Sequence, residues 1–227
     1  IEKSYLIFVS HCFEKEFFQY TGVNPDTLKG RISVIPNSIG TIFEQNVYQP
    51  LNIKYDFVTI RGSIDSEACA IETLNALAAA NPQYRFLLGG RGQLCSNVKK
   101  AANLEWQNRT LCHTEILELL NQCRFALMLT KRDTQGVMMC EMATYGIPLI
   151  TSDLPVCQEV LAGFDHVAFI SNTGTDDLAP IVERLAPYCV PHNARTQPYY
   201  ADTHSEKHVP LAHTYLTSQS FVGTRTR

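Results

Sequence analysis

Residues 124–153 read RFALMLTKRDTQGVMMCEMATYGIPLITSD, and this stretch decides the fold. Its first six residues are almost entirely apolar, as expected of a buried strand that ends near Leu129. Polar residues 130–135 follow and indicate a loop. The pattern then predicts a helix that Gly136 opens and that runs to about Tyr145. The stretch therefore predicts a strand, a loop and a helix in succession.

Two residues mark the end of this helix. Gly146 suits a left-handed C-terminal cap, and Pro148 cannot continue a helix because it lacks an N–H group. A second apolar strand, 148–151, follows. A helix between two buried strands is typical of an α/β unit with a parallel sheet.

The turn before the helix is the predicted binding site, because open α/β sheets bind ligands beyond the carboxyl ends of their strands. The N–H groups of Gly136, Val137 and Met138 would be free there. With the helix dipole behind them, they suit a phosphate or sugar oxygens. Asp133 precedes the helix and Glu141 lies in its second turn. Both carboxylates can therefore face one cleft and accept hydrogen bonds from paired hydroxyls.

Apolar runs alternate with helix-like segments along most of the chain. Residues 66–80 and 114–123 have the apolar spacing of helices. Most of the apolar runs are continuous, which is expected when helices cover both faces of a parallel sheet. The order predicts an α/β fold with a Rossmann-like, doubly wound parallel sheet. Strands are expected at 5–9, 32–35, 56–60, 85–88, 125–129, 148–151 and 167–170.

The composition is that of a globular protein with a substantial core: 227 residues, 45% hydrophobic and 18% charged. The formal net charge of -3 offers no basic field to nucleic acid, so no nucleic-acid partner is expected. No apolar run reaches the ~20 residues that span a bilayer, and no signal peptide is recognised. We therefore expect a cytoplasmic protein.

Eight cysteines are scattered along the chain without a CxxC pair. We interpret them as reduced, mostly buried thiols and not as a disulfide framework or a zinc site. Cys189 and His192 have ligand spacing, but no second pair would complete a metal site, so no metal is expected. The eight are Cys12, Cys69, Cys95, Cys112, Cys123, Cys140, Cys157 and Cys189.

The chain divides, in our interpretation, at a turn-rich joint. Residues 35–40 read IPNSIG after a strand, and the polar segment 41–52 follows, which favours an interdomain hinge. Residues 1–40 would be the end of a preceding domain with this hinge, 41–190 a complete domain, and 191–227 a tail that is partly helical or loose. Because the chain starts with Ile and enters a strand almost at once, we expect the earlier part of the first domain to be missing.

These features together resemble the retaining family-four glycosyltransferases of the GT-B fold. That family has two acidic residues separated by seven others: Glu-Gly-Phe-Gly, four residues, then Glu-Ala, a small residue and Gly-x-Pro-Val-Ile. Asp133 and Glu141 fall on the two acidic positions, and Gly136 falls on the second glycine. Residues 147–153 and Glu159 match the continuation of the family's pattern.

Two further motifs agree in the same order. Residues 34–39, VIPNSI, resemble the family's interdomain Ile-Pro-Asn-Gly-Ile. Residues 87–92, LLGGRG, resemble its Ile-Gly-x-Gly turn. The ordered agreement covers about residues 5–180 and is more specific than any single motif. The resemblance implies the C-terminal, donor-binding half of a GT-B fold, together with the end of its N-terminal domain.

The resemblance also implies roles for single residues. Asp133 would contact hydroxyls of the donor sugar and Glu141 the nucleotide ribose, which makes them the candidate catalytic residues. The family holds the diphosphate with an Arg and a Lys after the domain's first strand. Arg61 fits the first place. Glu67 falls on the second, unless the loop 62–66 aligns differently, and a carboxylate there would repel a diphosphate. The candidate ligand-binding residues are Arg61, Gly62, Gly90, Gly136, Val137 and Met138.

Two departures from the family's pattern bear on the donor sugar. Asp133 is one methylene shorter than the usual Glu, and Thr134 replaces the first glycine. Either change could alter the preferred sugar.

The implied function is transfer of a sugar from a nucleotide-diphosphate sugar to an acceptor hydroxyl with retention, in polysaccharide or glycoconjugate synthesis. No cofactor or metal is implied. The implied partners are the nucleotide sugar and an acceptor glycan or lipid-linked sugar, with peripheral membrane contact through the missing N-terminal domain. Because of Glu67 and the missing acceptor half, we expect this chain alone to bind nucleotide without transferase activity. The alternatives are a non-catalytic nucleotide-sugar-binding or scaffolding module, and a sugar-nucleotide epimerase-like enzyme.

Overall fold

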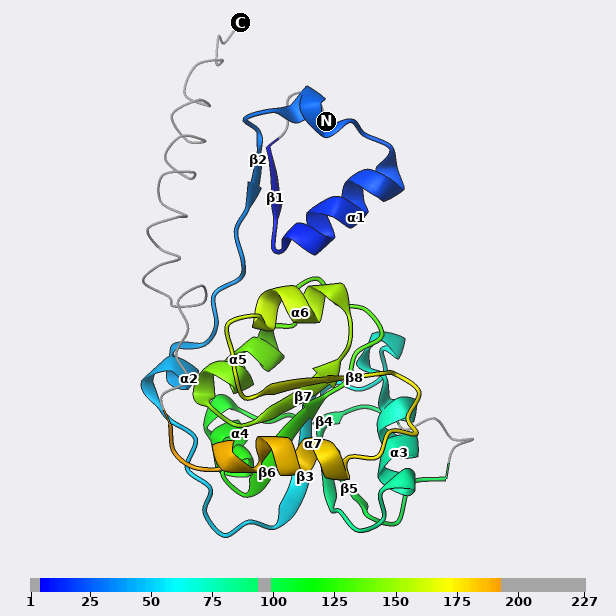
Figure 1. The fold of residues 1–227 in the computed structure, drawn as a ribbon, viewed down its shortest axis with the longest axis vertical. Helices are drawn as coiled ribbons and strands as arrows, with labels where there is room; N and C mark the ends of the chain where they lie inside the picture. The colour runs from blue at the N-terminus through cyan, green and yellow to red at the C-terminus, as the bar shows by residue number, and fades with distance from the viewer. Residues whose placement is uncertain (1–4, 94–98, 193–227) are drawn as a thin grey trace, which may run out of the picture.

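The computed structural model describes residues 5–93 and 99–192, which form a large and a small parallel sheet with flanking helices (Figure 1). The small sheet consists of β1 (Leu6–Phe8) and β2 (Ile32–Val34). The strands of the large sheet are β3 (Tyr55–Ser63), β4 (Phe86–Arg91), β5 (Leu104–Gln107), β6 (Cys123–Met128), β7 (Leu149–Ser152) and β8 (Val167–Ile170).

Seven α-helices and three 3-10 turns connect the described strands. The helices are α1 (His11–Thr21), α2 (Thr41–Gln45), α3 (Ile71–Ala80), α4 (His113–Leu120), α5 (Val137–Tyr145), α6 (Pro155–Leu161) and α7 (Ala179–Leu185). The 3-10 turns are η1 (Pro25–Leu28), η2 (Glu67–Cys69) and η3 (Ala186–Tyr188).

The order of strands in the large sheet is β5-β4-β3-β6-β7-β8, and every neighbouring pair is parallel. The chain builds outward from β3 to β5, then returns so that β6 pairs with the free side of β3. This is the doubly wound Rossmann order. The direction of winding reverses between β3 and β6, and ligands of such folds bind beyond the carboxyl ends of those two strands. The predicted fold class is confirmed.

Two apolar cores lie on opposite faces of the large sheet. One lies between the sheet and α4, α5 and α6, and the other between the sheet and α3 and α7. Successive residues of β6 alternate between them: Ala126 and Met128 belong to the first core, Phe125 and Leu127 to the second. Because both faces of the strand are covered, its sequence is a continuous apolar run.

The stretch 124–153 folds as its sequence predicts. β6, α5 and β7 follow one another, and α5 is flanked by two glycines with left-handed backbones, Gly136 (φ 70°) and Gly146 (φ 96°). The N–H group of Gly146 bonds to the carbonyls of Met142 and Ala143. The helix therefore ends in the glycine cap that the sequence indicates.

Three elements differ from the predictions. The predicted helix 114–123 ends earlier, at Leu120, and Cys123 already begins β6. The sequence pattern predicts no strand at β5, because its four residues, LEWQ, mix polar and apolar side chains. This mixture is tolerated because β5 is an edge strand and pairs on one side only. The predicted helix 66–80 begins later, at Ile71. The five residues before it form η2 and a left-handed turn at Ala70 (φ 49°), a conformation that cannot propagate a right-handed helix.

The N-terminal segment, residues 5–34, forms a small layer of its own beside α6 (Figure 1). β1 pairs with β2 in register, and α1 and η1 connect them. Phe8 on β1 contacts three phenylalanine rings of α1, at Phe13, Phe17 and Phe18. Aromatic contacts thus join the helix to its strand.

The connection after β2 is packed against the domain. Phe43 and Tyr48 are fully buried in the first core, and the Tyr48 hydroxyl donates to the Cys123 carbonyl at 2.7 Å. The segment 41–52, whose sequence is mostly polar, is therefore attached to the domain by its few aromatic residues. The domain boundaries after residues 40 and 190 stay predictions, and the tail from residue 193 onward lies outside the described residues.

Seven of the eight cysteines fall within the described residues, and each is a free thiol. Cys95 lies outside them. Within 5–93 and 99–192, no group of three or more His, Cys, Asp or Glu side chains could hold a metal ion. None of the described helices has the length and apolar character needed to cross a membrane.

Candidate functional site

A cavity of about 160 Å³ lies at the carboxyl ends of β3 and β6, where the winding of the sheet reverses. Its polar walls come from Arg61 at the end of β3 and from Thr130 and Asp133 in the loop after β6. The structure thus brings five of the eight candidate residues to one place, namely Arg61, Asp133, Gly136, Val137 and Met138. The remaining lining residues are Met128, Thr130 and Met139.

The first turn of α5 contributes main-chain N–H groups to this cavity. Gly136 precedes the helix in a left-handed conformation, and Val137 and Met138 are its first two residues. Those two N–H groups have no acceptor within the helix, because an α-helix leaves its first N–H groups unpaired. Two free donors at the positive end of a nine-residue helix dipole suit an anion in the cavity.

Replacing Gly136 with alanine should lower the free energy of unfolding by about 1–2 kcal/mol, because a side chain disfavours the left-handed backbone and its Cβ would clash with Met139. Urea denaturation measures the loss. Gly62→Ala is the matched control, since a Cβ there meets nothing within 4 Å and should cost less than about 0.5 kcal/mol. Equal losses in the two variants would contradict the prediction.

Arg61 provides the one cation among the residues that line this cavity. One of its terminal nitrogens donates to the Leu129 carbonyl at 2.5 Å, which fixes the guanidinium between the ends of β3 and β6. Its Nε is buried and has no hydrogen-bond partner within the described chain. Burial lowers the pKa of Arg61, while the nearby Cys69, Asp133 and Cys157 oppose the shift. A half-buried guanidinium whose Nε is buried and unused is a strong attachment point for an oxyanion.

The β6–α5 loop (residues 129–136) carries Asp133 and is rigidly held. The Thr130 hydroxyl lies 2.9 Å from the Ala68 carbonyl, and the Asn172 amide donates to the Thr130 carbonyl at 2.9 Å. Asp133 closes the turn itself, because its Oδ1 accepts the N–H groups of Thr134 (2.8 Å) and Gln135 (3.2 Å). The other carboxylate oxygen remains available for a ligand hydroxyl at the cavity wall.

Glu141 does not line the cavity that contains Asp133. It is only 6% exposed, and its Oε1 accepts the Gly40 N–H at 2.9 Å, so it faces the connection before α2. Burial raises the pKa of Glu141, while the Gly40 hydrogen bond and the charge of His113 act in the opposite direction. The predicted common cleft is therefore not a single cavity in this structure, and the ribose role of Glu141 stays a prediction.

The two remaining candidate glycines lie beside the cavity. Gly62 lines a second, open cavity of about 410 Å³ beyond β3, β4 and β5. Gly90 lines neither cavity, but a Cβ on it would lie 2.5 Å from the Arg61 carbonyl oxygen. Gly90 thus allows the backbone that carries Arg61 to approach closely. The second cavity is also lined by Ser63, Asp65, Arg91, Gly92, Gln93 and Asn108.

Glu67 lies on the exposed turn η2 and lines neither cavity. Cys69, two residues later, is the residue of this turn that acts on the pKa of Arg61, which it raises. The expected repulsion of a diphosphate by Glu67 is therefore not built into the walls of the cavity.

Two polar side chains of the β6–α5 loop are not among the residues that the sequence predicts for the site. Thr130 lines the cavity, and Gln135 is 1% exposed and bonds to Asn37. Their position in the loop after a buried strand was the available signal, since ligands bind at such loops. Their partners could not be read from the sequence.

No protein-family model and no curated protein matches the sequence. Solved structures do match. Sucrose-phosphate synthase from Thermosynechococcus elongatus has a TM-score of 0.68 and 16% identity, over 94% of this chain and 58% of its own. Anabaena HepE, solved with UDP and glucose, has a TM-score of 0.64 and 14% identity, over 93% and 63%. The pneumococcal O-GlcNAc transferase GtfA, solved with UDP and GlcNAc, has a TM-score of 0.63 and 14% identity, over 94% and 45%.

The chain therefore spans less than two thirds of each of these three proteins. At such low identity the likeness shows the fold: the described residues have the fold of part of a GT-B glycosyltransferase. The resemblance that the sequence motifs carry is confirmed at the level of the fold.

Proposed function

We propose that this chain is the donor-binding part of a glycosyltransferase and binds a nucleotide-diphosphate sugar. The single observation that carries the proposal is the cavity between β3 and β6, where a half-buried cation and a helix N-terminus face the same space. A diphosphate needs both kinds of partner, and as a leaving group it is stabilised by them. No metal or organic cofactor is part of the proposal.

The sugar and the ribose are assigned to the two carboxylates. Asp133 offers its outer oxygen to sugar hydroxyls at the wall of the cavity, next to the proposed diphosphate position. Glu141 offers its remaining oxygen to the ribose beside Gly40. These assignments follow the resemblance. Retention of anomeric configuration, an acceptor glycan or lipid-linked sugar, a role in polysaccharide synthesis, and peripheral membrane contact rest on the resemblance alone.

Titration calorimetry of this chain with UDP, UMP and UDP-glucose tests the proposal. UDP is the first probe because two of the structural neighbours were solved with it. UDP should bind at least about tenfold more tightly than UMP, because the second phosphate adds a charge-assisted contact worth about 1.5–3 kcal/mol. If UDP, GDP and ADP and their glucose conjugates all fail to bind, the proposal is wrong.

Asp133→Asn separates sugar from nucleotide recognition. The asparagine keeps the Oδ1 that caps the turn, so the β6–α5 loop should stay folded. UDP-glucose should bind about three- to tenfold more weakly, because charge-assisted hydrogen bonds to the sugar are lost, and UDP should bind as before. A parallel loss for both ligands would place Asp133 at the nucleotide and not at the sugar.

A nucleotide-binding module without catalysis is the second candidate. It is favoured by the single cation among the residues lining the cavity, which leaves a diphosphate leaving group less stabilised than two cations would. The turnover of an Asp133→Ala variant of the full-length protein decides between the two. A transferase should lose most of its sugar transfer, whereas the biological activity of a scaffold should persist.

A further inference from the structure

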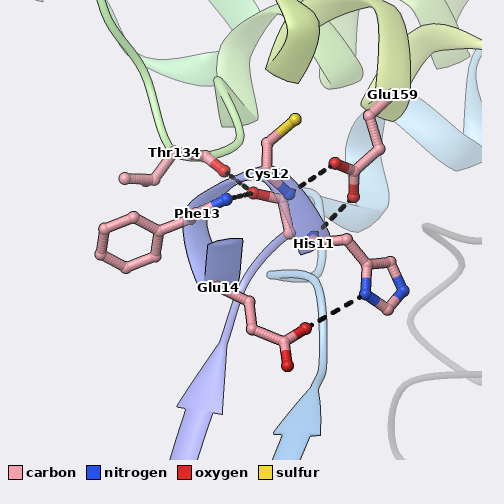
Figure 2. A network of polar contacts seen from close by, with 7 residues as sticks. His11, Cys12, Phe13, Glu14, Thr134 and Glu159 are labelled. Atoms are coloured by element: carbon pink, nitrogen blue, oxygen red, sulfur yellow. Dashed lines mark hydrogen bonds and ion pairs between the residues drawn. The ribbon is translucent and has the colours of Figure 1, made fainter. Parts of the chain in front are cut away.

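The N-terminus of α1 is closed by a carboxylate from a distant part of the chain. The N–H groups of His11 and Cys12 donate to the two oxygens of Glu159, at 2.7 and 2.8 Å (Figure 2). Glu159 belongs to α6, so one carboxylate joins the N-terminal segment to the large domain. Hydrogen bonds to a carboxylate at the positive end of a helix are among the stronger ones in proteins.

The N-terminus of α1 is also bonded to the β6–α5 loop. Ser10, the N-cap of α1, is 1% exposed; its Oγ accepts the Phe13 N–H at 3.2 Å and donates to the Thr134 carbonyl at 2.6 Å. Thr134 directly follows Asp133, which lines the cavity. One hydroxyl group therefore connects the first turn of α1 to the wall of the proposed donor site.

The next residue of the loop is bonded to the other end of the N-terminal region. The Gln135 Oε1 accepts the Asn37 N–H at 2.6 Å, and the Gln135 Nε2 donates to the Asn37 carbonyl at 2.9 Å. Gln135 is 1% exposed, so its side of both bonds is buried, whereas Asn37 lies at the surface. Two successive residues between Asp133 and Gly136 are thus held by residues 10 and 37.

We infer that Glu159 is a positioning residue that couples docking of the N-terminal segment to the geometry of the β6–α5 loop. Glu159 holds the first turn of α1, this turn holds Ser10, and Ser10 holds Thr134 beside the cavity. Losing the carboxylate leaves two helix N–H groups without their partner, which releases the turn and the loop together. Docking of the segment therefore adds the bond that fixes Thr134, beside the bonds within the domain that hold Thr130 and Asp133. The connection to donor binding rests on the proposed function.

Hydrogen exchange of the ligand-free chain tests the coupling. In Glu159→Gln, the amides of residues 11–13 should exchange at least about tenfold faster, and so should those of Thr134 and Gln135, whose N–H groups bond to Asp133. The second group is diagnostic, because the two bonds of Glu159 reach only His11 and Cys12. The control is Glu183→Gln, an exposed carboxylate on α7, which should exchange as the wild type does. Faster exchange confined to 11–13 would overturn the inference.

A second variant approaches the coupling from the opposite side. Ser10→Ala removes the bond to Thr134 but leaves Glu159 intact, so it should speed exchange at residues 134 and 135 by a similar factor. It also decides the question if Glu159→Gln does not fold, as judged by circular dichroism. Unchanged exchange at residues 134 and 135 in Ser10→Ala would overturn the inference.

UDP then links the coupling to the proposed function. In the wild type, UDP should slow exchange of the amides of residues 11–13, and in Glu159→Gln its Kd should rise about three- to tenfold, because coupling acts equally in both directions. If UDP binds but does neither, the coupling to the donor site is wrong. If UDP does not bind at all, the proposed function fails, while the exchange of the ligand-free variants still decides whether the segment and the loop are coupled.

Discussion

Replacing Arg61 with alanine should weaken UDP binding by about two orders of magnitude. The guanidinium lies half-buried at the end of β3, fixed by the Leu129 carbonyl, with a buried Nε donor that has no partner within the described residues. A buried charge-assisted contact contributes about 1.5–3 kcal/mol, and the upper part of that range corresponds to a hundredfold change in Kd. Titration calorimetry of the purified chain measures the change.

Two comparisons make this result interpretable. Arg61→Lys keeps the charge but not the planar donors, so its Kd should lie between those of the wild type and Arg61→Ala. Arg184→Ala is the matched control. Arg184 also donates to a strand carbonyl, that of Val167. It belongs to α7, which packs against the second core and does not line the cavity. If a folded Arg61→Ala variant binds UDP within twofold of the wild type, Arg61 does not bind the diphosphate and the proposed anion site is wrong.

Lowering the pH from 6.5 to 4 should lower the free energy of unfolding by about 3 kcal/mol through the titration of His166 alone. This side chain is 3% exposed, and its Nε2 lies 2.9 Å from the Ala143 carbonyl, which requires a donating, protonated Nε2. Burial lowers the pKa of His166 from 6.5 to about 4; the charge of His192 adds to the shift, and the Ala143 bond opposes it. Between pH 6.5 and about 4, His166 binds a proton in the unfolded chain but stays neutral in the folded chain. The free energy of unfolding therefore falls as the pH falls.

Urea denaturation at pH 7.0 and at pH 4.5 measures this effect. Carboxylates titrate over the same range, so the informative quantity is the difference between the wild type and His166→Gln. Glutamine stays neutral, and its amide can still donate to the Ala143 carbonyl. The variant should lose less stability on acidification than the wild type, by up to about 3 kcal/mol. Identical losses would mean that the imidazole accepts a proton inside the folded domain.

The fold was predictable where local signals agreed with one another. The glycine at each end of α5, the proline before β7 and the continuous apolar run of β6 each indicate the same strand–loop–helix–strand unit. β5 could not be predicted, because a four-residue edge strand has too few buried positions to form a pattern. The late start of α3 was hidden because Ala70, a good helix former, adopts a left-handed backbone.

The candidate site was predictable in part, for a related reason. The position of Asp133 and Gly136 after a buried strand indicates a ligand site, because topology alone places that loop at the carboxyl edge of the sheet. The orientation of Glu141 was not predictable. Helical spacing gives the phase of a side chain, but the neighbour that it meets, here Gly40, lies 101 residues earlier in the chain. The same holds for Glu159, whose partners precede it by 147 and 148 residues.

The burial of Phe43 and Tyr48 limits how the N-terminal segment can rotate. With both rings in the first core, and the Tyr48 N–H bonded to the Tyr145 carbonyl, the chain after α2 moves as one rigid body with the domain. Rotation must then use the main-chain torsions of residues 35–40, where Pro36 already has a fixed φ. Since Gln135 and Glu141 hold Asn37 and Gly40, a rotation about residues 35–40 would strain the bonds that join this connection to the loop before α5 and to α5 itself.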